Sequence, residues 1–343
     1  MPLLVLSAAD VHAALGFAEC AQAVRGALTA LAAGHAQQPL RTVIQPAGAA
    51  GLVALMPAYL ADDGGTGLAG DGGAAAYGLK ALCITPGNPA AGLDTHQGVV
   101  LLSDGRTGEP LAILNASAVT EIRTAAVSVV ATELLARTDA ATLAVIGAGV
   151  QGRAHILALD HALRLTEVRV ASRDPSGAER LAARVRDRTR ASVRACSSAR
   201  EAVTGADIIV TATSSAAPVL HRDWIAPGTH INAVGACLPH VRELDSATVG
   251  AGVLFADRRD SLFAESGDYR LAAADGVAGP DSVRAELGQI LVGAADGRHD
   301  DSEITIFESL GLAVEDLAAA ALAYRQAVQA VQTGAPVGNW VSF

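Results

Sequence analysis

The chain has 343 residues, of which 51% are hydrophobic and 17% charged, and its formal net charge at pH 7 is -10. This length and composition are typical of two folded domains with large apolar cores, and they exclude extensive disorder. The negative charge argues against nucleic acid or an anionic membrane as the main partner.

The N-terminal residues carry no recognisable targeting signal. No cationic segment precedes the first apolar residues, and no apolar run in the chain reaches the ~20 residues that span a bilayer, so we expect a cytoplasmic protein. The four cysteines (Cys20, Cys83, Cys196 and Cys237) show neither C-x-x-C spacing nor a nearby pair of histidines. The sequence therefore predicts no metal site and no disulfide framework.

The first 116 residues predict a region of helix and antiparallel sheet. A strand at 3–6 leads into Ser7-Ala8-Ala9-Asp10, which resembles a capping box, and one helix of 3.6-residue apolar period then continues to a stop at Gly34. Short β-like runs follow at 41–45, 51–57, 77–85 and 98–103, with the longest turn at 62–73. Their spacing predicts a meandering sheet without β-α-β alternation.

Helices and strands alternate from residue 117 onward. A long amphipathic helix is predicted at 117–136, and candidate strands follow at 142–146, 167–171, 192–196, 207–212, 229–234, 252–256 and 303–307. This alternation predicts a doubly wound parallel sheet. A last apolar helix at 311–331 is expected to return to the first domain, which would make that domain discontinuous.

A glycine loop marks the centre of the second domain. Gly147-Ala148-Gly149-Val150-Gln151-Gly152 follows the strand at 143–146 and fits the G-x-G-x-x-G pattern of dinucleotide-binding folds. Gly147 would permit a tight turn, Gly149 the approach of a pyrophosphate, and Gly152 close packing of the next helix. The helix that begins near Val150 would point free N–H groups at the phosphates. The alternative is a purely structural turn.

The end of the second strand of this domain predicts which nucleotide binds. NAD-binding versions of the fold carry an acidic residue about 20 positions after the glycines, whereas this chain has Ser172 and Arg173. A hydroxyl and a guanidinium would accommodate a 2′-phosphate, so the sequence predicts NADPH in preference to NADH. Asp174 is the counter-argument, but its position before Pro175 favours a helix cap.

A series of short motifs runs along nearly the whole chain. They are Met56-Pro57-Ala58-Tyr59, Gly78-Leu79-Lys80, Pro86-Gly87-Asn88, His96-Gln97-Gly98, Ile122-Arg123-Thr124-Ala125-Ala126, the glycine loop, and the segments 231–236, 265–268, 285–288 and 307–316. In this order they resemble the ornithine cyclodeaminase/μ-crystallin family, and the μ-crystallin branch above all. The resemblance implies a Rossmann-type α/β domain (117–317) that binds NAD(P), inserted into a discontinuous α+β domain (1–116 and 318–343) that binds substrate and forms a homodimer.

The resemblance also implies a role for individual residues. Reduction of an imino acid needs cations that hold its carboxylate and a proton donor for its nitrogen. The resemblance implies that Lys80 and Arg123 are the catalytic residues. Arg41, Met56, Lys80, Arg123, Glu265 and Leu310 form the implied substrate site. The implied cofactor site comprises Thr95, His96, Arg123, Thr124, Gly147, Ala148, Gly149, Val150, Gln151, Gly152, Ser172, Arg173, Ala212, Thr213, Val234 and Leu310. Without the resemblance, Arg41, Lys80 and Arg123 could be surface residues, His96 could be a turn residue, and Met56 could be a core residue.

Two positions depart from the pattern of the family. Cys237 stands where cyclodeaminases of the family carry an aspartate, and a thiol does not stabilise an iminium as a carboxylate does. Glu308 stands where relatives often carry a cation, which changes either the pocket or only the surface. The first departure disfavours deamination and favours simple reduction of a C=N bond.

The function that the sequence favours is NADPH-dependent reduction of a cyclic ketimine carboxylate, such as pyrroline-2-carboxylate or piperideine-2-carboxylate, to the L-amino acid. The alternatives are an ornithine or lysine cyclodeaminase, an alanine-type amino-acid dehydrogenase, and an enzyme of opine-type condensation. A non-catalytic protein that binds NADPH and a small ligand is a further alternative, from a different functional class.

Overall fold

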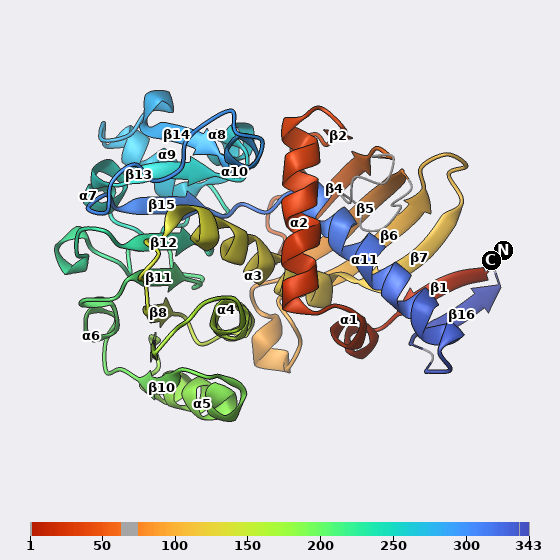
Figure 1. The fold of residues 1–343 in the computed structure, drawn as a ribbon, viewed down its shortest axis with the longest axis horizontal. Coiled ribbons are helices and arrows are strands. Elements are labelled where there is room, and N and C mark those ends of the chain that lie inside the picture. The colour runs from red at the N-terminus through yellow and green to blue at the C-terminus, as the bar shows by residue number, and fades with distance from the viewer. Residues whose placement is uncertain (1, 63–74, 336, 343) are drawn as a thin grey trace. The chain divides into compact units, whose positions relative to one another are not determined.

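The computed structural model of the protein describes residues 2–62, 75–335 and 337–342. Its contacts divide the chain into unit 1, Met1–Arg123 with Leu312–Phe343, and unit 2, Thr124–Gly311 (Figure 1). The boundary falls within one helix, α3 (Ala116–Leu135), which confirms the helix predicted at 117–136. Of the long turn predicted at 62–73, all but residue 62 lies outside the described residues.

Unit 1 is built on one sheet whose strands lie in the order β16-β1-β7-β6-β5-β4-β2, with β3 paired to β4. The strands are β1 (Pro2–Leu6), β2 (Ala36–Gln37), β3 (Thr42–Ile44), β4 (Leu52–Leu60), β5 (Ala76–Ile84), β6 (His96–Asp104), β7 (Pro110–Asn115) and β16 (Asn339–Ser342). Each strand from β4 to β7 pairs antiparallel with the next, which confirms the predicted meander. β7 was missed because its initial proline is typical of a turn, although a proline is tolerated at the first position of a strand.

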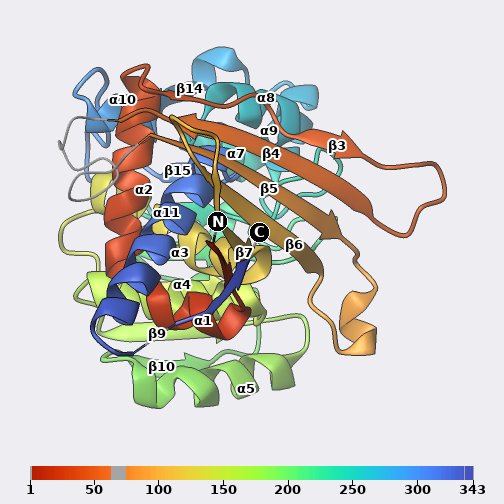
Figure 2. The ribbon, with the colours of Figure 1, turned by 90° about the vertical axis from the view of Figure 1, so that its right-hand side faces the viewer.

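Two helices cover one face of this sheet. α11 (Ala313–Gln332) packs on β4, β5 and β6, and α2 (Phe17–Ala32) packs on α11 (Figure 2). The predicted capping box at Ser7 and Asp10 is confirmed at α1 (Ala8–Ala14). The single helix expected up to Gly34 is wrong, because Leu15 is extended and Gly16 caps α2, so the chain breaks at a residue with low helix propensity. Since α11 comes from the end of the chain, unit 1 is discontinuous as predicted.

Unit 2 contains a parallel sheet in the order β10-β9-β8-β11-β12-β15-β13-β14, which confirms the predicted fold class. Its strands are β8 (Thr142–Ile146), β9 (Glu167–Ala171), β10 (Ser192–Ala195), β11 (Ile208–Thr211), β12 (His230–Ala233), β13 (Val253–Ala256), β14 (Val283–Glu286) and β15 (Thr305–Glu308). β14 was missed because Arg284 and Glu286 interrupt its apolar character. The strand order reverses direction at β8, and a switch point of this kind is where such sheets bind ligands.

The connections of unit 2 are mostly short helices. They are α4 (Val150–Ala162), α5 (Pro175–Val185), α6 (Ala199–Val203), α7 (Ser246–Ala251), α8 (Arg259–Glu265), α9 (Gly267–Ala274) and α10 (Leu287–Leu291). Every residue of β11, β12 and β15 is buried, as expected of a parallel sheet that is covered on both faces. Among the described residues of the whole chain, no helix combines the length and hydropathy needed to cross a membrane.

Candidate active site

The glycine loop of unit 2 leaves β8 at the switch point of the sheet. Gly147 has a φ of +123°, and a Cβ there would lie 2.3 Å from the carbonyl oxygen of Ala212. A Cβ on Gly152 would lie 2.0 Å from the carbonyl oxygen of Gly147, so neither position accepts a side chain. Gly149 caps the 13-residue helix α4, and the space that its Cβ would fill is open. The loop therefore fits a pyrophosphate on the free N–H groups of α4.

The other predicted cofactor residues of β11 and β12 lie at the same edge of the sheet. Ala212 and Thr213 follow β11, and Val234 follows β12. The carboxylate of Glu243 holds these two connections together, because it accepts hydrogen bonds from the backbone N–H groups of Thr213 (2.6 Å) and Gly235 (2.7 Å). Burial raises the pKa of Glu243. Sequence reasoning missed this residue, since nothing near it in the sequence indicates its partners.

The end of β9 presents the residues that distinguish nucleotides. The Asp174 carboxylate accepts a hydrogen bond from the N–H of Ser176 (3.1 Å) and pairs with Arg180 (3.2 Å), so the predicted cap of α5 is confirmed. The hydroxyl of Ser172 donates to the carbonyl oxygen of Asp174. Arg173 is exposed, and its guanidinium forms no ion pair with the described carboxylates. The Arg173 guanidinium is therefore available to bind a phosphate, whereas the neighbouring Asp174 carboxylate is already bound to the start of α5 and to Arg180.

In unit 1, two buried cations meet two buried carboxylates of α11. Lys80 Nζ lies 2.6 Å from Asp316 Oδ2, and Arg123 Nε donates to Asp316 Oδ1 at 3.0 Å. Arg123 Nη1 donates to Glu315 Oε2 at 2.9 Å. Lys80 is 2% exposed, Arg123 5%, Glu315 0% and Asp316 1%. We call these four residues the charge cluster.

The fold explains how a lysine comes to lie inside unit 1. Alternate residues of β5 face α11, and Lys80 occupies one of these inward positions, with Met56 as its cross-strand partner on β4. Arg123 reaches the cluster from α3, and both acids lie in the first turn of α11. Burial lowers the pKa of Lys80 to about 8, although Asp316 acts in the opposite direction. A lysine in this state can release a proton near neutral pH, whereas an arginine cannot.

Two further predicted residues of unit 1 lie near the charge cluster. The half-buried His96 begins β6, and burial together with the charges of Lys80 and Arg123 lowers its pKa. Arg41, also half-buried, precedes β3 and is close enough that its charge lowers the pKa of Lys80. Thr95, next to His96, accepts a hydrogen bond at its carbonyl oxygen from the N–H of Thr85. The structure thus gathers most of the predicted substrate residues of this unit in one place.

The remaining predicted residues lie in unit 2. Thr124 is buried in α3, and Glu265 ends α8 with an exposed fraction of 9%. Leu310 follows β15, and its N–H donates to Asp257 Oδ2 at 2.8 Å. Glu308 is 1% exposed and accepts a hydrogen bond from the Ser266 hydroxyl at 2.9 Å, so the interpretation of Glu308 as a surface change is wrong.

Sequence reasoning missed Glu315 and Asp316 as site residues. They lie within the motif at 307–316, but acidic residues in the first turn of a helix ordinarily interact with its dipole. Their signal is that they directly precede an apolar run of this helix, residues 317–323, and charges inside such a core are buried only when paired. The composition carries a second signal: of the 25 lysine and arginine residues in the chain, Lys80 is the single lysine.

A glycine loop at the switch point of a parallel sheet is typical of proteins that bind a dinucleotide, and a buried lysine of lowered pKa is a candidate for proton transfer. Residues 2–330 match the family described as the ornithine cyclodeaminase/mu-crystallin family. The chain belongs to this family, as the motifs indicated.

Individual relatives support the same assignment. The ketimine reductase mu-crystallin of Mus musculus is 39% identical over 291 residues, which cover 85% of each chain. The structure of Thermococcus litoralis Delta(1)-pyrroline-2-carboxylate reductase in complex with NADH and L-proline superposes with a TM-score of 0.91 at 35% identity, covering 99% of this chain and 100% of that one. An archaeal alanine dehydrogenase dimer with bound NAD has a TM-score of 0.89 at 32% identity, with both chains fully covered.

Proposed function

We propose that the protein reduces cyclic ketimine carboxylates, of the pyrroline-2-carboxylate or piperideine-2-carboxylate type, to L-amino acids with NADPH. The observation that carries this proposal is the charge cluster, because it combines a guanidinium for a carboxylate with a lysine that can donate a proton. The relatives include a ketimine reductase and a pyrroline-2-carboxylate reductase, which act on this class of substrate.

Each group of residues has a distinct task in this reaction. Arg123 and Arg41 hold the substrate carboxylate, and Arg123 does so while its Nε and Nη1 donate to Asp316 and Glu315. Lys80 donates the proton that the imine nitrogen gains. Met56, Glu265 and Leu310 border the substrate. The nicotinamide, when bound, supplies the hydride.

We assign nucleotide binding to residues 117–317 and substrate binding to 1–116 with 318–343. The glycine loop and Thr124 would hold the pyrophosphate, and Ala212 and Thr213 would lie near the adenosine. Thr95, His96, Val234 and Leu310 would approach the remainder of the cofactor. Ser172 and Arg173 favour NADPH, because an exposed guanidinium that pairs with none of the described carboxylates attracts a 2′-phosphate.

The test is oxidation of NADPH, and separately NADH, followed at roughly 340 nm. Both ketimines are supplied as substrates, and Lys80→Ala is the control. We expect the wild type to reduce the ketimines and to prefer NADPH over NADH. We expect Lys80→Ala to lose this activity. If neither ketimine is reduced while NADPH still binds, the reductase proposal fails for these substrates, and a non-catalytic binder becomes the better account.

We also propose that the protein is a homodimer formed through the face of the unit 1 sheet that α11 leaves uncovered. The outward positions of β4 to β7 carry no charged residue; they are Val53, Leu55, Pro57, Tyr59, Tyr77, Leu79, Ala81, Cys83, Gln97, Val99, Leu101, Ser103, Leu111, Ile113 and Asn115. Tyr77 is 51% exposed and Val99 43%. Contiguous exposed apolar residues on one face are typical of an interface.

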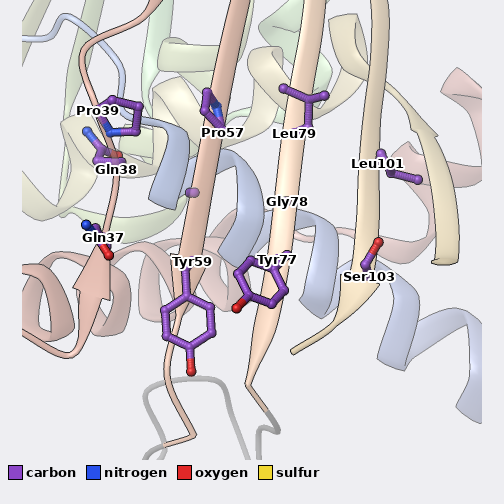
Figure 3. Close-up of a pocket in the computed structure, with 11 residues that line it drawn as sticks. Gln37, Gln38, Pro39, Pro57, Tyr59, Tyr77, Gly78, Leu79, Leu101 and Ser103 are labelled. Atoms are coloured by element: carbon purple, nitrogen blue, oxygen red, sulfur yellow. The ribbon is translucent and has the colours of Figure 1, made fainter. Parts of the chain in front are cut away.

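A cavity of about 600 Å³ opens on this face. Figure 3 shows Tyr59 and Tyr77 side by side in it, with Pro57, Leu79 and Leu101 beyond them. It is lined by none of the predicted site residues, and an archaeal relative is a dimer. Sedimentation of the wild type should therefore give twice the monomer mass, and Val99→Lys should give the monomer mass. A Val99→Lys protein that stays dimeric would place the interface elsewhere.

A further inference from the structure

One carboxylate joins the two predicted catalytic cations of unit 1. Asp316 contacts Lys80 through Oδ2 and Arg123 through Oδ1. We propose that Asp316 is a positioning residue, which fixes Lys80 beside Arg123 and keeps Lys80 in its charged, proton-donating form. This inference rests on the proposed function and deepens it, because it names the residue that prepares the proton donor.

The geometry requires a partner of this kind. A lysine ends in a compact charge on a flexible four-carbon stem, so its position is fixed only by what it contacts. Nζ also lies 3.5 Å from Thr120 Oγ1, which is long for a hydrogen bond. Among the described residues, Asp316 is the carboxylate within ion-pair distance of Lys80. Its second oxygen binds Arg123, so one rigid group orients both cations.

The surrounding charges make the lysine dependent on Asp316. Burial, Arg123 on α3 and Arg41 ahead of β3 all favour the neutral amine, and Asp316 favours the ammonium. His96 on β6 and Glu315 on α11 are close enough to respond to the charge of Lys80. Without the carboxylate of Asp316, the pKa of Lys80 would fall below its value of about 8.

The composition of the chain supports a need for a dissociable proton at this position. The other 24 basic residues, 25 less Lys80, are all arginines. A cation that only held a carboxylate would be served at least as well by arginine, which binds carboxylates bidentately. Reduction of a C=N bond adds a hydride to carbon and a proton to nitrogen. If Lys80 provides that proton, an N–H bond of its ammonium breaks, the electron pair stays on Nζ, and water returns the proton afterwards.

Glu315 provides a matched control. It neighbours Asp316 on the same helix and is equally buried, but it pairs with Arg123 and not with Lys80. Glu315→Gln and Asp316→Asn therefore remove the same charge from the same cluster. Only the second removes the partner of Lys80.

The experiment uses NMR of protein labelled with [ε-15N]lysine, in which Lys80, as the single lysine, gives one side-chain signal. We expect a pKa of about 8 for wild type, and a pKa about one to three pH units lower for Asp316→Asn. Glu315→Gln should stay closer to wild type. Asp316→Glu, which keeps the charge, should restore the higher value. Equal shifts in Asp316→Asn and Glu315→Gln, or none in the first, would overturn the inference.

A second readout uses ketimine reduction. At pH 8 the kcat of Asp316→Asn should fall by about 5-fold or more, with the alkaline limb of the pH profile displaced to lower pH. Glu315→Gln should mainly raise KM, because it disturbs Arg123. If the wild type reduces neither ketimine, the proposed function fails, and the NMR titration still decides the role of Asp316 at Lys80.

Discussion

Lys80→Arg separates the two roles that a cation can play at this position. The substitution keeps the positive charge, so a substrate carboxylate still meets a cation. It removes the dissociable proton, because the arginine pKa lies above ~12. If Lys80 only holds the carboxylate, the variant should work nearly as well as the wild type.

The expected loss follows from the chemistry of proton transfer. A positioned general acid contributes about 100- to 10,000-fold to rate, so kcat should fall by about 100-fold or more. KM should change less, by under about 10-fold, because the charge persists beside Arg123. Lys80 is 2% exposed, so the larger guanidinium also disturbs packing, and overpacking costs about 1–3 kcal/mol.

The assay is steady-state oxidation of NADPH with a ketimine, after circular dichroism and thermal unfolding have shown that the variant is folded. Arg123→Lys is the contrasting control: it keeps the charge but loses the planar group of N–H donors that orients the substrate carboxylate in the proposed reaction, so KM should rise more than kcat falls. A folded Lys80→Arg that keeps its kcat within about threefold would refute the reasoning, because general-acid loss predicts at least ~100-fold.

Two other consequences of the structure can be tested. Arg173→Ala should raise the KM for NADPH by about 10-fold or more, because a hydrogen bond to a charged group contributes ~1.5–3 kcal/mol. The KM for NADH should stay nearly unchanged. Equal effects on both nucleotides would show that Arg173 does not bind the 2′-phosphate. Burial raises the pKa of Asp268 to about 7 from 3.8, so its protonated form stabilises the fold and this contribution is lost as pH rises between about 4 and about 7. Chemical denaturation should show wild type losing stability relative to Asp268→Asn over that range, and parallel curves for the two proteins would contradict the assignment.

Sequence patterns predicted the elements whose cause is local. Some features depend only on residues that are close together in the sequence, so a local pattern predicts them. They are the glycine loop, the cap at Asp174 and the helix α3. Local patterns gave a wrong prediction at Gly16, where one continuous helix was expected. They also gave no strand at β14, because two charged residues interrupt its apolar pattern. β16 depends on pairing with β1, which comes from the other end of the chain. β7 also pairs with β1, as a parallel neighbour in which Ala112 lies opposite Leu4.

The candidate site was predictable only in part for a related reason. Lys80 and Arg123 were found through motifs shared with a family, and composition alone could not separate them from surface residues. Their partners were missed because Arg123 and Asp316 are 193 positions apart. Glu243 likewise accepts hydrogen bonds from backbone groups that are 30 and 8 positions away, at Thr213 and Gly235. Burial of a charge is a tertiary property, and its compensating partner is visible only when the fold brings the two together.

The central claim is tested most directly by analysing the products of a complete reaction with piperideine-2-carboxylate and NADPH. The account predicts one L-amino acid formed for each NADPH oxidised, with no ammonia released and no product from Lys80→Ala. Ammonia released from ornithine, lysine or alanine, with both ketimines left unreduced, would contradict it and make the protein a deaminating member of its family.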